Sequence, residues 1–151
     1  MDLLNKVRKF LLLESKTKRL FMEAFFYLGL ARLLISIPFS KVAPSLGEPM
    51  KETTNIPIAQ NRAALIDVYE AIRIISNNTF WESKCLVRAI AGMKMLNRRG
   101  IESTLYLGTA RDETGKMIAH AWLRSGPFYI SGAEEMDRFT VVGKFAKTAN
   151  S

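Results

Sequence analysis

Two residues of this 151-residue chain could together carry out nucleophilic chemistry, and each is the only one of its type. Cys85 is the single cysteine, and His120 is the single histidine. A thiol nucleophile needs an imidazole base close to it in the fold, but not in the sequence. We therefore take Cys85 as the candidate nucleophile and His120 as the candidate base.

Cys85 falls at the predicted beginning of a helix. Ser83 is a suitable N-cap, apolar residues recur through residues 84–96, and Gly100 follows as a C-terminal stop. Unpaired backbone N–H groups and the helix dipole favour an anion in the first turn, and Lys84 adds a positive charge. The position favours a reactive thiolate, although taken alone a free cysteine is more often a small buried apolar residue.

His120 lies on the middle one of three consecutive predicted strands, at residues 103–109, 116–124 and 127–131. A two-residue loop at Ser125-Gly126 would pair Arg124 with Pro127 and place Ser131 opposite His120. A three-residue loop would place Gly132 there instead. Taken alone, this histidine would be interpreted as a core residue bonded to the backbone. Its combination with the helix-start cysteine favours catalysis.

The first part of the chain is predicted to be helical, at residues 2–13 and 15–37, followed by a loop at 38–57 and a third helix at 58–75. Glu23 and Arg32 break the apolar run of the second helix, which falls short of the ~20 residues that cross a bilayer. Because this helix is apolar nearly all round, we expect the rest of the domain or a partner to cover it. With a fourth strand at 139–142, the helices precede an antiparallel meander, which predicts an α+β fold.

The composition is that of an ordinary globular domain, with 48% hydrophobic and 24% charged residues. One cysteine excludes an internal disulfide, and with one histidine it disfavours a metal site; a reducing cytoplasm is the expected location. The net charge is +8. This charge leaves open a non-enzymatic basic adaptor that binds nucleic acid or an anionic membrane, although no nucleic-acid motif is present.

Several short segments match a known family in their order and spacing over nearly the whole chain: Glu23-Ala24, Gly29-Leu30-Ala31-Arg32, Pro38-Phe39, Leu46-Gly47, Lys84-Cys85-Leu86, Arg98-Arg99-Gly100-Ile101, Leu107-Gly108, His120-Ala121-Trp122 and Arg138-Phe139. In these segments the chain resembles the lasso-peptide leader peptidases, a transglutaminase-like bacterial family. The resemblance implies a transglutaminase/papain-like cysteine protease core at residues 51–151. A helical region at residues 1–50 would then dock the partner or the leader.

The resemblance also implies a function, which is removal of the leader peptide from a ribosomally made lasso-peptide precursor before macrolactam closure. The implied partners are the precursor leader, a separate small leader-binding protein and the ATP-using lasso cyclase. We expect the basic residues before residue 20 to face an acidic leader or an acidic surface of that partner. An acyltransferase using the same Cys–His pair is the enzymatic alternative. No metal or organic cofactor is called for.

One position departs from the family pattern. The family commonly carries an aspartate about twelve residues after the histidine, where this chain has Gly132. A bulged strand could bring in a carboxylate from Glu134, Glu135 or Asp137; otherwise Ser131 or a backbone carbonyl would orient the imidazole. The backbone N–H of Cys85 is the expected oxyanion donor, and candidates for a second donor are Trp81 and Gln60.

Overall fold

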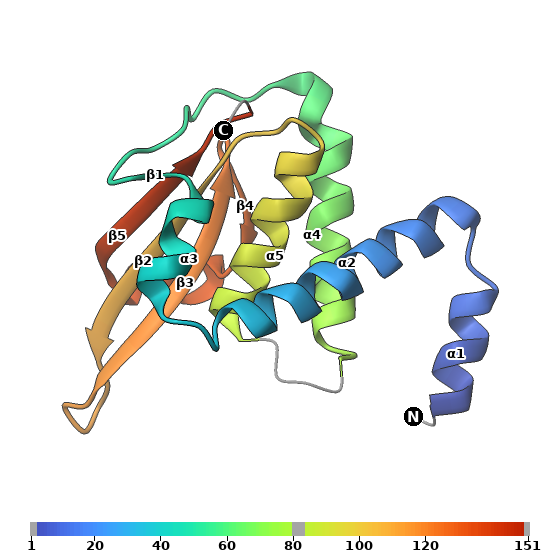
Figure 1. Ribbon diagram of the computed structural model, residues 1–151, viewed down its shortest axis with the longest axis horizontal. Helices are drawn as coiled ribbons and strands as arrows, with labels where there is room; N and C mark the ends of the chain where they lie inside the picture. The colour runs from blue at the N-terminus through green and yellow to red at the C-terminus, as the bar shows by residue number, and fades with distance from the viewer. Residues whose placement is uncertain (1–2, 80–83, 150–151) are drawn as a thin grey trace.

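The computed structural model describes residues 3–79 and 84–149, in which helices lie on one face of a five-stranded antiparallel sheet and the first helix lies to one side (Figure 1). The helices are α1 (Leu3–Leu11), α2 (Ser15–Leu34), α3 (Phe39–Val42), α4 (Arg62–Ser76) and α5 (Cys85–Arg98), with 3-10 turns η1 (Ala43–Leu46), η2 (Ala59–Asn61) and η3 (Ala133–Arg138). The strands are β1 (Glu48–Pro49), β2 (Ser103–Arg111), β3 (Met117–Ser125), β4 (Phe128–Ser131) and β5 (Thr140–Lys147). The predicted α+β class is confirmed.

The strand order is β1-β5-β2-β3-β4. Strands β2, β3 and β4 form the predicted meander. The last strand does not continue it, because β5 crosses back through η3 and pairs with the other edge of β2. The prediction of a simple four-stranded meander is therefore wrong. Strand β5 is also longer than predicted, because it must span the pairing with both β2 and β1.

The predicted loop at residues 38–57 contains α3, η1 and β1. Val42 and Leu46 from this segment are buried in the core. Gly47 has a φ of +117°, and a Cβ there would collide with the backbone of Ala146 in β5. The segment is thus held against the sheet at a point that only glycine permits.

Helix α5 lies directly on the sheet because it has no side chain at the point of closest approach. A Cβ added at Gly92 would lie 2.8 Å from Cδ2 of Leu123 in β3. Helix α4 lies beside α5, and α2 crosses both helices and shares their core (Figure 1). Helix α2 contributes Ala24, Leu28 and Ala31 to that core, all fully buried. The division of the chain into a helical docking region at residues 1–50 and a protease core at residues 51–151 stays a prediction.

An ion pair joins α2 to the end of α5. The guanidinium of Arg99 donates to both carboxylate oxygens of Glu23, at 2.6 and 2.8 Å, and also to the carbonyl of Met95 at 3.0 Å. This hydrogen bond to Glu23 raises the pKa of Arg99. The segments Glu23-Ala24 and Arg98-Arg99-Gly100-Ile101 of the sequence resemblance therefore meet in space. Their ion pair fixes the angle between α2 and α5.

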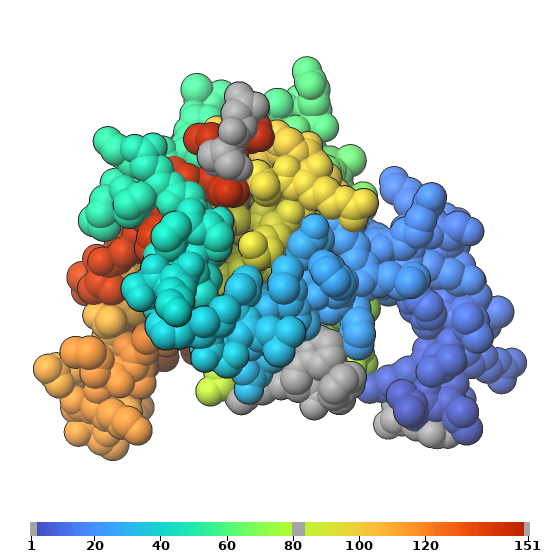
Figure 2. All heavy atoms as spheres, viewed as in Figure 1, coloured from blue at the N-terminus to red at the C-terminus, as the bar shows by residue number. Residues whose placement is uncertain are grey.

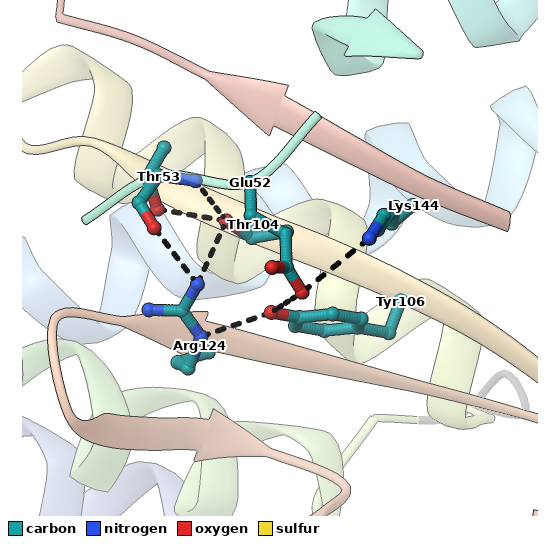
Figure 3. A network of polar contacts seen from close by, with 6 residues as sticks. All are labelled: Glu52, Thr53, Thr104, Tyr106, Arg124 and Lys144. Atoms are coloured by element: carbon teal, nitrogen blue, oxygen red, sulfur yellow. Dashed lines mark hydrogen bonds and ion pairs between the residues drawn. The ribbon is translucent and has the colours of Figure 1, made fainter. Parts of the chain in front are cut away.

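The other face of the sheet is covered by the chain around Glu52 and Thr53, which is held by a buried arginine (Figure 3). Arg124 is 4% exposed, and it donates to the carbonyl of Thr53 at 3.0 Å and to the hydroxyl of Tyr106 at 3.0 Å. The hydroxyl of Tyr106 donates in turn to Glu52 at 2.9 Å. This polar network therefore lies on the face of the sheet opposite the apolar core.

Candidate active site

Cys85 is the first residue of α5, and its side chain is partly buried against the core. The predicted N-cap, Ser83, lies outside the described residues. The N-cap position is taken by Lys84, with φ −70° and ψ 172°, so the helix begins one residue later than predicted. In the first helical turn the backbone N–H groups have no partner within the helix. The thiol therefore lies where an anion is favoured, as the sequence predicts.

His120 lies in the middle of β3, and its ring is held by a backbone carbonyl. Its Nε2 atom is 2.7 Å from the carbonyl oxygen of Gly132. The ring packs between two aromatic side chains, with centroid distances of 5.8 Å to Trp122 and 5.0 Å to Phe139. The imidazole is therefore fixed from three sides, by β3 itself, by the end of β4 and by the segment entering β5.

The contact with Gly132 decides which nitrogen of His120 can act as a base. A carbonyl oxygen only accepts hydrogen bonds, so Nε2 must carry the proton and donate it to Gly132. In the neutral ring Nδ1 then has the free lone pair. The contact thus leaves Nδ1, and not Nε2, with the lone pair that a base requires.

Gly132 could not be replaced at this position without moving the chain. Its φ is +77°, a left-handed conformation, and a Cβ there would collide with the carbonyl of Ala121 and lie 2.9 Å from the Cβ of Trp122. A side-chain carboxylate therefore has no room at the residue where the resembling family carries aspartate. The main-chain carbonyl of the same residue makes the contact to the imidazole instead.

The predicted register of the second hairpin is wrong. The loop consists of Gly126 and Pro127, because Ser125 pairs with Phe128. The register then shifts between Leu123 and Arg124, so that Leu123, and not His120, lies opposite Ser131. The shift leaves one extra residue in β4, Ile130, whose side chain is buried against α5.

The orienting role predicted for Ser131 depended on that register. Its Oγ is buried and has no hydrogen-bond partner within the described residues. The alternatives Glu134, Glu135 and Asp137 lie on η3 and are exposed, and Glu135 is 3.6 Å from Arg138. Among the described residues, the hydrogen bond of His120 is made to Gly132 and to none of these side chains.

Cys85 and His120 lie at the same end of the helix and sheet layers. Gly92 lies over Leu123, and Figure 1 shows α5 and β3 rising in the same direction. Cys85 precedes Gly92 by seven residues, or about 10 Å of helix. His120 precedes Leu123 by three residues, or about 10 Å of strand.

The two groups are not in hydrogen-bond contact. Leu123 faces α5, and alternation along β3 places His120 with Trp122 on the opposite face. Within residues 3–79 and 84–149, no hydrogen bond joins the Cys85 thiol to the His120 ring. The structure thus places Cys85 and His120 at one end of the molecule without a hydrogen bond between them. Direct proton transfer between them requires the two side chains to approach each other around this end of the sheet.

Of the candidates for a second oxyanion donor, Trp81 lies outside the described residues. Gln60 lies in η2, before the start of α4, whereas Cys85 follows the end of that helix. Because a 15-residue helix is about 22 Å long, Gln60 is far from the thiol. The structure therefore does not bring Gln60 into the site.

Sequence reasoning named the two aromatic residues that hold the imidazole, in the segments His120-Ala121-Trp122 and Arg138-Phe139, but gave neither of them a role beside the ring. The alternation of side chains along the strand predicts that Trp122 shares a face with His120, and the ring contact agrees with this. The contact of Phe139 with the ring could not have been predicted, because it arises only through the crossing of η3 from β4 to β5.

Comparison of the sequence with known protein families gives a match. A family model described as "Transglutaminase-like superfamily" matches residues 24–144, which include α5, the whole β2–β3–β4 meander and most of β5. Neither the curated proteins nor the solved structures contain a significant match. Since the match covers most of the chain and contains both Cys85 and His120, the chain belongs to the transglutaminase-like superfamily.

Proposed function

We propose that this protein is a cysteine peptidase that removes the leader from a lasso-peptide precursor before macrolactam closure, in the cytoplasm. The observation that supports a Cys–His mechanism best is the orientation of His120, whose Nε2 is engaged by Gly132 at 2.7 Å and whose Nδ1 is left to act as a base. Membership in the transglutaminase-like superfamily supports acyl chemistry at a cysteine. The choice of substrate comes from the segments that resemble the leader peptidases.

In the proposed acylation step, the Cys85 sulfur attacks the carbonyl carbon of the last leader residue. His120 takes the thiol proton at Nδ1 and transfers it to the departing nitrogen, which becomes the free amino terminus of the core peptide. The negative charge on the tetrahedral oxygen is stabilised by the backbone N–H of Cys85 at the start of α5. The leader remains on Cys85 as a thioester.

In the proposed deacylation step, His120 removes a proton from a water molecule, which attacks the thioester carbon. The thiol is regenerated, and the leader departs with a free carboxylate. The carbonyl of Gly132 carries a dipole and no net charge, so it stabilises the imidazolium less than a carboxylate would. We expect slow turnover from the pair alone.

The separate leader-binding protein is proposed to dock on the outward face of α2. This face exposes Met22, Phe25, Phe26 and Leu33, at 61%, 45%, 62% and 68%, while the inward face is buried in the core. Helix α2 is therefore only half covered by its own domain. A partner that covers the other half would complete its burial and could position the leader; the lasso cyclase is a further proposed partner.

The test is incubation of the precursor and its leader-binding protein with this chain, followed by mass spectrometry of both peptide products. Hydrolysis gives a leader that carries one added water and a core peptide with a free amine. Transfer of the leader to an added amine instead would favour the acyltransferase alternative. Intact precursor in every combination of the three components would contradict both enzymatic functions.

A further inference from the structure

Helix α1 has no buried residue, although five of its nine residues are apolar. Leu3, Leu4, Val7 and Leu11 are 72%, 75%, 47% and 62% exposed. At 100° per residue these four and Phe10 share an arc of about 120°. We call these five residues the apolar stripe of α1.

The rest of the described chain leaves most of this stripe uncovered. Figure 1 places α1 to one side of the other elements, and Figure 2 shows a gap between it and the body of the molecule. The stripe approaches α2 and α4 only at its edge, where Phe10 lines a cavity of about 310 Å³ with Phe21, Met22, Phe25 and Ile75. A helix shorter than about 12 residues is marginal in water, so α1 needs a second surface to stabilise it.

The charges around the stripe indicate what that surface is. Residues 3–19 hold six cations, Lys6, Arg8, Lys9, Lys16, Lys18 and Arg19, and one carboxylate, Glu14. On the helical projection, Lys6 and Arg8 each lie about 40° beyond one edge of the apolar arc, so cations flank it on both sides. Their apolar stems can lie along an apolar layer while the charges reach anions at its border.

We propose that α1 and the basic start of α2 dock on the surface of an anionic lipid bilayer. The stripe would enter the boundary between headgroups and acyl chains, and the flanking cations would meet the phosphates, as in interfacial amphipathic helices. Among the described helices none has the length and apolar content needed to cross a bilayer. A flat surface that is both apolar and anionic fits cations on both edges of the stripe better than a purely acidic leader, which fits the cations alone.

The test is flotation of the full-length chain with vesicles of phosphatidylcholine, or of phosphatidylcholine and phosphatidylglycerol in equal parts. We expect binding to the anionic vesicles only, and weaker binding as salt rises. Val7→Glu combined with Leu11→Glu should weaken binding at least tenfold, because two apolar side chains no longer enter the bilayer. Leu33→Glu on α2 is the matched control, with a leucine of similar exposure, 68% against 62%, and should bind as the unchanged chain does.

The charge contribution is tested with Lys6→Gln and Arg8→Gln, each of which should weaken binding about fivefold, from the ~1 kcal/mol that a cation contributes near an anionic surface. These residues are outside the core, so matching circular dichroism is expected. Equal binding to both kinds of vesicle, or equal loss in Leu33→Glu, would overturn the proposal. So would a loss of leader cleavage in vesicle-free buffer in the Val7→Glu, Leu11→Glu variant, which would assign the stripe to a protein partner.

Discussion

The imidazole of His120 is oriented by the main chain of Gly132, with 2.7 Å between Nε2 and the carbonyl oxygen. The bond forms because Gly132 adopts a φ of +77° at the end of β4, which turns its carbonyl toward β3. The residue thus replaces a side-chain carboxylate with a backbone group. A backbone carbonyl cannot be removed by substitution, but it can be displaced by adding a Cβ.

Gly132→Ala is therefore expected to lower kcat by about a hundredfold, the scale of a misplacement of about 1 Å in an active site. The added methyl group must move away from Ala121 and Trp122, and the carbonyl moves with it. KM should change little, because the residue holds the base and not the substrate. The measurement is steady-state cleavage of the precursor complex at a temperature where the variant is folded.

Gly115→Ala is the matched control for that variant. Gly115 also has a positive φ, +85°, but nothing lies within 4 Å of its added Cβ. Backbone strain in Gly115→Ala should therefore lower the free energy of unfolding by about 1–2 kcal/mol, while kcat stays unchanged. If both variants lose kcat equally, the loss follows from stability and not from the orientation of His120.

Substitution of the four side chains that the sequence offers as orienters of His120 should have small effects on the rate. We expect Ser131→Ala, Glu134→Ala, Glu135→Ala and Asp137→Ala each to reduce the rate by about tenfold or less, because a triad member would cost far more. Single-turnover cleavage of the precursor measures each rate. A loss of about a thousandfold at any of the three acidic positions would show that η3 moves on substrate binding and supplies a carboxylate.

Arg124→Met is expected to destabilise the fold by about 3 kcal/mol, because hydrogen bonds from a buried charged group are lost and their acceptors stay buried. The acceptors include the carbonyls of Thr53 and Thr54 and the hydroxyl of Tyr106. Urea unfolding followed by circular dichroism measures the difference. Arg111→Met, at an exposed arginine in the adjacent hairpin, should change the stability by less than about 0.5 kcal/mol. Similar losses in the two variants would contradict a supporting role for the Arg124 network.

Tyr106 makes the same network sensitive to alkaline pH. Burial raises the pKa of Tyr106, and its hydrogen bond to Glu52 acts in the same direction, against the opposing effect of Arg124. A group whose pKa is higher in the folded state contributes its full stability below the unfolded pKa, which is about 10 for tyrosine. This contribution is lost as the pH rises from there through the higher folded pKa. As the pH rises above about 10, the free energy of unfolding should therefore fall less in Tyr106→Phe than in the unchanged chain. Tyr69→Phe, on the exposed side of α4, is the comparison; an equally flat profile there would contradict this assignment.

Local signals in the sequence were sufficient to predict the elements that carry the pair. Gly100 ends α5 as predicted, with a φ of +69° and a hydrogen bond from Ile101 back to Leu96. The alternating pattern of residues 103–125 predicts β2 and β3 to within two residues at each end. These features depend on neighbours in the chain, which is why periodicity and end signals reveal them.

The rest depended on packing between distant segments. The bulge at Ile130 arises because its side chain fills a space beside Gly92 of α5, a contact that no hairpin rule contains. The loop at Gly126 and Pro127 and this bulge together moved the partner of Ser131 from His120 to Leu123. The crossing of η3, which brings Phe139 to the imidazole, likewise follows from the pairing of β5 with β2.

The most direct measurement of the proposed chemistry is intact-protein mass spectrometry of the enzyme during turnover of the precursor complex, quenched in acid. The account predicts a species heavier by the mass of the leader acyl group, which hydroxylamine removes and which peptide mapping locates on Cys85. Cys85→Ala should show neither this species nor leader release, with an unchanged circular dichroism spectrum, and His120→Ala should accumulate almost none. Leader release by Cys85→Ala at the rate of the unchanged chain would contradict the account.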